Sequence, residues 1–284
     1  MSQPETKAQE TTSNESNIAK EPLICLLGGM GPMAGILFHK ILTQNTKVSK
    51  DQEHLNVIHL SLPKLISDRT GFLMDKTGKA INPGIQVANI VKNISNMATN
   101  LKKSLYVVAT CNTFHSPKIF GELIKECNSF NKTIKTKYGK IYVQHMIEST
   151  IKYIVDTLKC KNIGLMSTTG TRQTKLYPNT ALSLGYNDVK IIEVDDDNQS
   201  ELHDSIYNSK DGIKTLSAPS KRVRANFEKY VKQLKGKGCK VVILGCTEIP
   251  IALPEQELFD VKLVDPMTVL ALKTIKDVQN WNQQ

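Results

Sequence analysis

Two stretches of sequence decide the fold: SLYVVATCNTFHSP at residues 104–117 and CKVVILGCTEIPIA at residues 239–252. Each begins with an apolar run that is typical of a buried parallel strand. Each then has a cysteine, a polar turn that contains threonine, and a proline near a predicted helix start. The repeat predicts two related α/β halves, with Cys111 and Cys246 each at the carboxyl end of a strand. Ligands of open α/β sheets bind at that edge.

Strand-like and helix-like patterns alternate outward from these two stretches. Short apolar runs predict the strands, and apolar positions that recur every three to four residues predict the helices. This alternation is typical of an α/β fold with parallel sheets. The predicted strands are 23–29, 56–62, 104–111, 140–146, 162–168, 189–195 and 240–247, and the predicted helices are 33–43, 83–101, 117–127, 148–160, 225–239 and 267–278.

The repeated stretch also predicts how the chain divides into domains. Residues 1–21 are polar and rich in serine, threonine, glutamate and asparagine, so we expect a disordered tail there. Residues 22–137 together with 261–284 are predicted to form an N-terminal α/β domain. Residues 138–260 are predicted to form a second α/β domain related to the first by a pseudo-twofold axis. The polar segment 128–139 is predicted to link the two halves.

The charge of the chain bears on its partners. Its formal value is +10, from 37 lysines and arginines against 27 aspartates and glutamates. Nucleic-acid readers depend on arginine for bidentate contacts, and the basic residues here are nearly all lysines. We therefore expect no nucleic-acid partner. No stretch approaches the roughly 20 apolar residues of a membrane span, so no membrane partner is expected either. The only arginines are Arg69, Arg172, Arg222 and Arg224.

The six cysteines are scattered and form no CxxC motif, so neither a zinc finger nor a disulfide scaffold is indicated. His54 and His59 have no third ligand at a suitable spacing, and we predict no metal site. The N-terminus has no apolar signal region, so a reducing cytoplasm is the expected location. Only the two cysteines with matched surroundings are assigned a role. The others are Cys25, Cys127, Cys160 and Cys239.

A thiol that directly precedes a helix faces unpaired N–H groups and a partial positive charge. Both favour the thiolate and lower the thiol pKa. If Cys111 and Cys246 face each other across a cleft, they can flank a single carbon atom. One would then remove a proton as thiolate while the other donates a proton from the opposite face, which inverts a stereocentre. The alternative is that both are small buried core residues.

Six short motifs follow one another along the chain: GGMGP at 28–32, DRT at 68–70, CNT at 111–113, TTGT at 168–171, GCTE at 245–248 and VDPM at 264–267. Together they resemble those of the aspartate/glutamate racemase family, and the resemblance runs from about Leu23 to the C-terminal helix. It implies two Rossmann-like domains with the active site between them, a homodimer, and racemisation by two cysteines without pyridoxal phosphate or any other cofactor.

The resemblance also implies roles for individual residues. Arg69 matches the family arginine that clamps a substrate carboxylate, a task suited to its planar fork. Lys214 matches the lysine that assists at the distal carboxylate, with Lys210 as a rival assignment. The glycine-rich turn at 28–31 is an anion cradle that lacks the GxGxxG spacing of a dinucleotide site. The remaining predicted substrate-binding residues are Met30, Gly31, Asn112, Thr113, Thr169, Thr171, Thr247 and Glu248.

Two features bear on the branch and on the substrate. Glutamate racemases usually have histidine after the second Cys-Thr, and this chain has Glu248, which favours the aspartate racemase branch. Glu248 is expected to orient the substrate ammonium or to modulate Cys246. Phe114 replaces the alanine that often follows Cys-Asn-Thr, so it changes the substrate size if it faces the pocket. His115 is expected to be structural, the alternative being that it tunes Cys111.

The leading hypothesis is thus cofactor-independent racemisation of aspartate, with glutamate as a further substrate. A second hypothesis keeps the superfamily and changes the reaction. Relatives similar to maleate isomerase and arylmalonate decarboxylase use similar cleft cysteines for isomerisation or decarboxylation. A third is a non-catalytic binding protein, to which the basic segments 221–224 and 235–240 would contribute.

Overall fold

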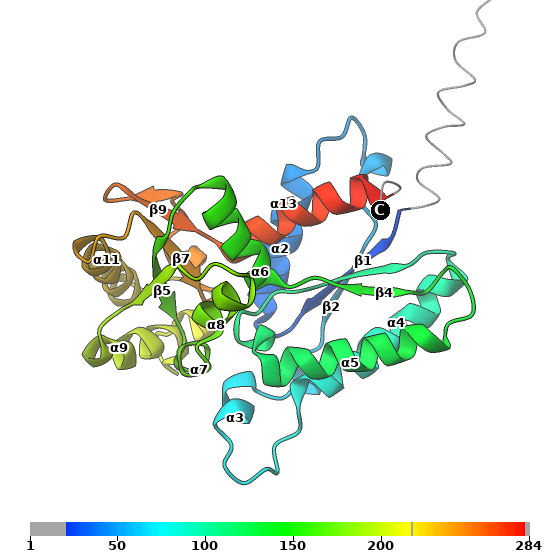
Figure 1. Cartoon of the computed structure of the whole chain (residues 1–284), viewed down its shortest axis with the longest axis horizontal. Coiled ribbons are helices and arrows are strands. Elements are labelled where there is room, and N and C mark those ends of the chain that lie inside the picture. The colour runs from blue at the N-terminus through cyan, green and yellow to red at the C-terminus, as the bar shows by residue number, and fades with distance from the viewer. Residues whose placement is uncertain (1–20, 217, 282–284) are drawn as a thin grey trace, which may run out of the picture.

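Two mainly parallel sheets frame the fold in the computed structural model, which describes residues 21–216 and 218–281 (Figure 1). The predicted α/β class with parallel sheets is confirmed. The first sheet has the order β2-β1-β3-β4 and is parallel throughout. The second has the order β6-β5-β7-β9-β8, and only β8 is antiparallel to its neighbour. The strands are β1 (Leu23–Gly28), β2 (Val57–Ser61), β3 (Leu105–Ala109), β4 (Ile141–Val143), β5 (Asn162–Ser167), β6 (Lys190–Glu193), β7 (Val241–Gly245), β8 (Glu257–Leu258) and β9 (Val261–Val264).

Helices cover both faces of each sheet, because successive side chains of each strand point to opposite faces. In β1, Ile24 and Leu26 face α2 and α13, whereas Cys25 and Leu27 face α4 and α5. The second sheet lies between α6 and α8 on one face and α9 and α11 on the other. The helices are α2 (Pro32–Asn45), α3 (Arg69–Met74), α4 (Pro83–Asn100), α5 (Pro117–Thr133), α6 (Met146–Lys152), α7 (Thr169–Gln173), α8 (Leu176–Ser183), α9 (Asp196–Tyr207), α10 (Ile213–Leu216), α11 (Lys221–Gly236), α12 (Ile249–Ala252) and α13 (Pro266–Gln279).

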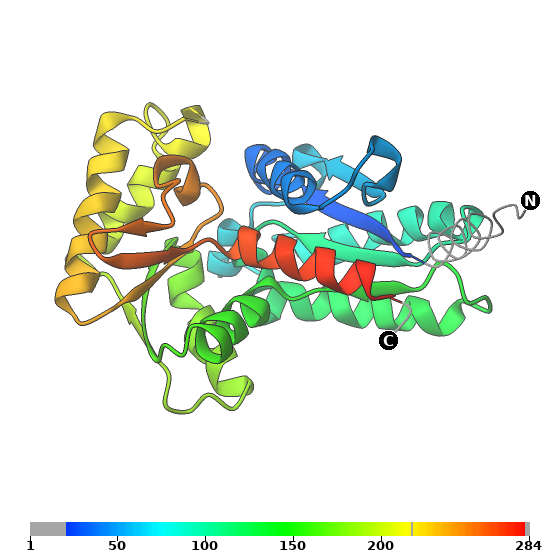
Figure 2. The same cartoon turned by 90° about the horizontal axis from the view of Figure 1, so that it is seen from above.

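One hydrophobic cluster joins the two halves. It contains Leu26 and Val108 from the first sheet, Leu165 and Ile243 from the second, and Leu270 of α13. Figure 2 shows α13 running from the second sheet over the first half. It packs against α2 of the first half and against α6, which covers the second sheet. The two sheets are therefore held in a fixed relation by a continuous apolar core, and so are the ends of their strands.

The strands at the two predicted domain boundaries, β4 and β9, each belong to the sheet of the other half. The predicted boundaries placed β4 in the second domain and β9 in the first. In the structure β4 pairs with β3, and β9 pairs with β7. The chain thus crosses between the halves after Val143 and again after Val264. A short apolar run shows that a strand forms, but it does not show which sheet the strand joins.

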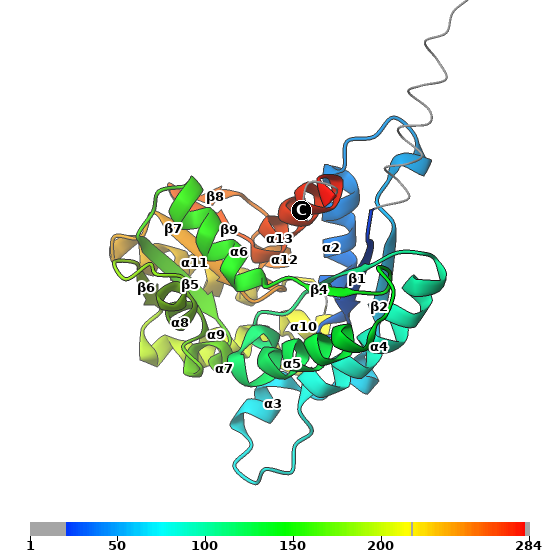
Figure 3. The same cartoon turned by 45° about the vertical axis from the view of Figure 1, so that its right-hand side comes forward.

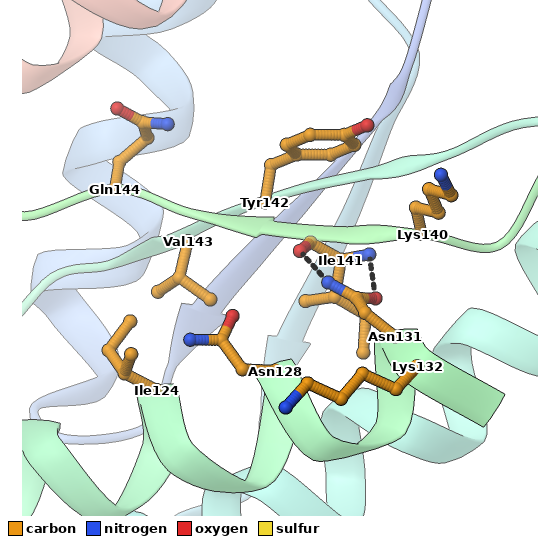
Figure 4. Close-up of a pocket in the computed structure, with 9 residues that line it drawn as sticks. All are labelled: Ile124, Asn128, Asn131, Lys132, Lys140, Ile141, Tyr142, Val143 and Gln144. Carbon is orange, nitrogen blue, oxygen red and sulfur yellow. Dashed lines mark hydrogen bonds between the residues drawn. The ribbon is translucent and has the colours of Figure 1, made fainter. Parts of the chain in front are cut away.

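The predicted link at 128–139 is also partly helical, because α5 continues to Thr133 and packs Phe130 against the first core. Asn131 on α5 then ties down the edge strand β4. Its side chain accepts from the backbone N–H of Ile141 and donates to the carbonyl of the same residue, both at 2.8 Å (Figure 4). Of the predicted disordered tail, 1–20 lie outside the described residues.

Candidate active site

A narrow cavity lies where the carboxyl ends of strands from both sheets meet. Cys111 follows β3 and Cys246 follows β7, and both line this cavity with only 7% and 5% of their surface exposed. The cavity volume is about 10 Å³, room for about one water molecule. The structure thus brings the two predicted cysteines into one enclosed site. Its lining residues are Met30, Arg69, Cys111, Asn112, Thr113, Thr168, Tyr207, Lys214, Gly245, Cys246, Thr247 and Glu248.

Arg69 is fixed at the first position of α3. Its Nη2 donates to the carbonyl of Met30 at 2.8 Å and its Nη1 donates to the carbonyl of Ser67 at 3.2 Å. Burial alone would lower the pKa of Arg69, but the neighbouring Cys111, Asp68 and Tyr207 outweigh it and raise that pKa. The guanidinium Nε is buried without a partner. Arg69 is therefore a permanent, preorganised cation beside one of the two thiols.

The opposite side of the cavity contains a buried carboxylate, Glu248, of which 2% is exposed. Its Oε1 accepts from the Lys214 ammonium at 2.5 Å. Its Oε2 accepts from the Cys246 thiol at 3.0 Å and from the Thr247 hydroxyl at 3.1 Å. Figure 3 shows α10, which contains Lys214, and α12, which follows Glu248, at the junction of the two halves. Lys210 does not line the cavity, so Lys214 is the lysine of this site.

These contacts set the protonation states of the second thiol and its neighbours. Burial raises the pKa of Glu248, but the Lys214 ammonium outweighs burial and lowers it, so the carboxylate is ionised. Burial, and next the Glu248 carboxylate, raise the pKa of Cys246 well above that of an ordinary thiol. The expected lowering by a helix N-terminus is thus wrong for Cys246, because α12 is only four residues long and an anion lies against the thiol.

Hydrogen bonds between threonine hydroxyls connect the two halves next to the cavity. Thr113 follows β3, and its Oγ1 lies 3.3 Å from that of Thr168 and 3.0 Å from that of Thr171. Thr168 also caps α7 by accepting from the N–H of Thr171. Of the predicted threonines, Thr113 and Thr247 line the cavity, whereas Thr169 and Thr171 do not. Thr171 instead contacts Thr113, hydroxyl to hydroxyl.

Three residues that line the cavity were not among the predicted site residues: Tyr207, Thr168 and Gly245, the last residue of β7. Tyr207 ends α9, and the Lys214 ammonium lies 5.5 Å from the centre of its ring. Thr168 directly follows β5, just as Cys246 directly follows β7. Its position after a predicted strand was a usable signal, because the carboxyl ends of parallel strands share an edge. A single aromatic residue at a helix end gives no comparable signal.

A larger hollow of about 460 Å³ adjoins the cavity and shares Arg69, Lys214 and Glu248 with it. Gly31, at the start of α2, lines this hollow rather than the cavity itself. Met30 lines the cavity, and its backbone carbonyl accepts the hydrogen bond from Arg69. The glycine-rich turn therefore forms part of the boundary between the enclosed site and the hollow.

Comparison with known proteins identifies the family of the chain. A model of the Asp/Glu/hydantoin racemase family matches residues 27–274 of the chain. The chain belongs to this family. Glutamate racemase 3 of Caldanaerobacter subterraneus subsp. tengcongensis is 33% identical over 149 residues, which cover 51% of each protein. The chain thus matches about half the length of this curated relative.

Solved structures of the racemase family share the fold. Picrophilus torridus aspartate racemase has a TM-score of 0.68 at 21% identity, covering 90% of this chain and 94% of that one. A putative Asp/Glu racemase from Yersinia pestis has a TM-score of 0.62 at 18% identity, covering 93% of this chain and 100% of that one. At these identities the likeness is one of fold.

Two residues near Cys111 in this racemase-family chain face the core. Phe114, the residue that departs from the usual alanine, is fully buried in the core of the first half and does not line the cavity. His115 is also buried, and its Nδ1 lies 2.8 Å from the carbonyl oxygen of Cys111. Burial, and next His145, lower the pKa of His115 to about 3, so its ring is neutral. Both residues support the turn from the core side.

Residues 21–216 and 218–281 contain no group of metal-ligating side chains and no helix suited to a bilayer. No three histidine, cysteine, aspartate or glutamate side chains in this part of the chain are grouped so that they could hold a metal ion. No helix there combines the length and the apolar character that a bilayer crossing requires.

We expect Gly31→Ala to lower kcat/KM about tenfold in an amino-acid racemase assay. A Cβ on Gly31 would lie 2.0 Å from Glu248 Oε1 and 3.2 Å from Lys214 Nζ, so the ion pair must move. Overpacking of this kind costs about 1–3 kcal/mol, and here it acts on the site itself. The measurement is steady-state kinetics, with Gly121→Ala as control because a Cβ there meets nothing within 4 Å. Equal kinetics for both variants would show that the ion pair need not hold its position.

Proposed function

We propose that this protein racemises aspartate by two-base proton transfer at Cα, without pyridoxal phosphate or a metal ion. The observation that supports this is the pairing of Cys111 and Cys246, one from each half, in a single enclosed cavity with two cations. A thiol on each face of one carbon atom is the arrangement that inversion by proton transfer needs.

The charges of the cavity fit an acidic amino acid. Arg69 and Lys214 are cationic and Glu248 is anionic, so the three side chains together contribute one positive charge. Aspartate has two carboxylates and one ammonium, with a net charge of −1. Arg69 is placed to bind one carboxylate in a bidentate manner, and Glu248 can accept from the substrate ammonium. Lys214 would then bind the second carboxylate of the substrate.

The reaction balances within the two thiols. Cys111, beside the Arg69 guanidinium, acts as the thiolate that takes the α-proton. Cys246, kept protonated by its surroundings, donates its proton to the opposite face of the carbanion. A donor to the α-carboxylate stabilises the negative charge that develops there, and Asn112, whose Nδ2 has no other partner, is the proposed donor. The single hydroxyl proton of Thr247 is donated to Glu248. One turnover leaves the two thiols with exchanged protonation states, so the reverse reaction uses Cys246 as the base.

The size of the cavity supports aspartate over glutamate. With room for about one water molecule, the enclosed site must widen to admit either substrate, and the shorter one requires less. One extra methylene changes specificity by about 10- to 200-fold in a tight pocket. We propose aspartate as the better substrate and glutamate as the weaker one. The homodimer stays a prediction.

Proton exchange in deuterium oxide tests this function. The reduced, full-length protein is incubated with L-aspartate, and separately with L-glutamate, in deuterium oxide. We expect D-aspartate with deuterium at Cα, formed faster than D-glutamate, because the proton donated by Cys246 comes from solvent. The measurement is chiral chromatography with mass spectrometry. No exchange with any acidic amino acid would rule out the proposed function.

A further inference from the structure

The two ends of the Asn112 amide lie in different surroundings. Its Oδ1 accepts a hydrogen bond from the Tyr177 hydroxyl at 2.5 Å. Its Nδ2 is buried and has no hydrogen-bond partner. Asn112 is 3% exposed and lines the cavity beside Cys111. A buried donor without a partner is costly unless a ligand satisfies it, so this NH2 group points to a substrate acceptor.

Tyr177 reaches Asn112 from the other half of the molecule. It lies on α8, its ring is fully buried in the cluster that joins the two sheets, and it does not line the cavity. Burial, and next the nearby Asp265 and Cys246, raise the pKa of its hydroxyl well above that of an ordinary phenol. The hydroxyl therefore stays protonated and serves as a donor. The oxygen is the only acceptor of a carboxamide, so the Tyr177 hydroxyl can donate only to Oδ1 of Asn112.

We propose that Tyr177 is a positioning residue that fixes the orientation of the Asn112 amide, so that its NH2 group faces the substrate carboxylate. This rests on the proposed function, because the acceptor is the α-carboxylate of the acidic amino acid. The two ends of a carboxamide have nearly the same shape, and only their hydrogen-bond partners distinguish them. Without Tyr177 the amide can turn its oxygen toward the carboxylate, where the two partial negative charges repel each other.

The test is a double-mutant cycle with Tyr177→Phe, Asn112→Ala and the double variant. Tyr177→Phe removes a single oxygen and keeps the ring that packs in the core. We expect it to weaken L-aspartate binding and to lower kcat/KM about three- to tenfold, the size of one net hydrogen bond. In the Asn112→Ala background the same change should alter both quantities less than twofold. Binding is measured by calorimetry and turnover by chiral chromatography.

Tyr106→Phe is the matched control. Tyr106 is also a buried tyrosine of the joining cluster, and its hydroxyl donates to Asp277, away from the cavity. We expect this variant to lower the thermal midpoint without changing kcat/KM. Additive effects of Tyr177→Phe and Asn112→Ala, or unchanged kinetics in Tyr177→Phe, would overturn the positioning role while the racemase remains. A wild-type protein that neither binds nor exchanges acidic amino acids would overturn both proposals.

Discussion

Replacing either Cys111 or Cys246 with serine should lower the rate of aspartate racemisation about 10²- to 10⁴-fold, the usual contribution of one general acid or base. A serine hydroxyl occupies nearly the same space but gives up its proton far less readily than a thiol. In the proposed mechanism inversion needs both cysteines, because each serves one face of Cα. The measurement is the initial rate of D-aspartate formation, followed by chiral chromatography on the folded variants.

Isotope exchange separates the two roles. If Cys246 is replaced, Cys111 can still remove the α-proton of one enantiomer and return a deuteron to the same face. That enantiomer should then exchange its α-proton with deuterium oxide without inverting. Replacing Cys111 should leave one-sided exchange of the other enantiomer through Cys246.

Cys160→Ser is the control for this pair. Cys160 is partly exposed, and its thiol donates to the carbonyl of Asn162 at 3.3 Å, outside the cavity. We expect it to racemise aspartate at the wild-type rate. Racemisation at that rate by Cys111→Ser would contradict the two-base mechanism, whichever substrate is used.

The part of the site that follows the strand ends could be predicted from the sequence. Cys111 and Cys246 follow strongly apolar runs, and the carboxyl ends of parallel strands meet at one edge of a sheet. That rule depends on local pattern alone, so it needs no knowledge of tertiary contacts. The same rule places Asn112, Thr113 and Thr247, each within two residues of such a cysteine.

Residues that reach the site from elsewhere could not be predicted in this way. The Lys214–Glu248 contact joins residues 34 positions apart, and Tyr177 contacts Asn112 across 65 positions. Neither pair has a spacing that any periodic pattern would indicate. The error of sign for the pKa of Cys246 has a different cause, because the helix-terminus argument omitted the Glu248 carboxylate, which is only two residues along the chain. The predicted domains of β4 and β9 were wrong because packing, which a local pattern does not show, decides which strands pair.

Glu248→Gln should lower the free energy of unfolding by about 3–5 kcal/mol, the usual cost of removing one partner of a buried ion pair. The Lys214 ammonium would remain in the enclosed site without a counter-charge. Glutamine keeps one oxygen that can accept from the Cys246 thiol and the Thr247 hydroxyl, but its NH2 group cannot accept from Lys214, so the change removes both the charge and the hydrogen bond to the ammonium. The measurement is urea denaturation followed by circular dichroism, with the unfolding midpoint and slope fitted together.

The pH dependence of the free energy of unfolding should reflect the Lys214–Glu248 ion pair. The pKa of Glu248 is lowered in the folded state, so its contribution is present above the ordinary glutamate range and is lost as the pH falls through the folded pKa. Burial lowers the pKa of Lys214, but Glu248 outweighs it and raises that pKa, so this contribution is lost only in strong alkali. We therefore expect the stability difference between wild type and Glu248→Gln to be flat near neutrality and to shrink below about pH 4.

Two further variants decide whether burial is the cause. Glu126 forms an ion pair with Lys92 at the same 2.5 Å, but that pair is partly exposed, so Glu126→Gln should change the unfolding midpoint little. Combining Glu248→Gln with Lys214→Met removes both charges, the buried carboxylate and the largely buried ammonium, and should restore much of the lost stability. Aspartate turnover should stay low in that double variant, because the cation beside the substrate is gone. If the double variant were less stable than Glu248→Gln alone, the uncompensated ammonium could not be the source of the instability.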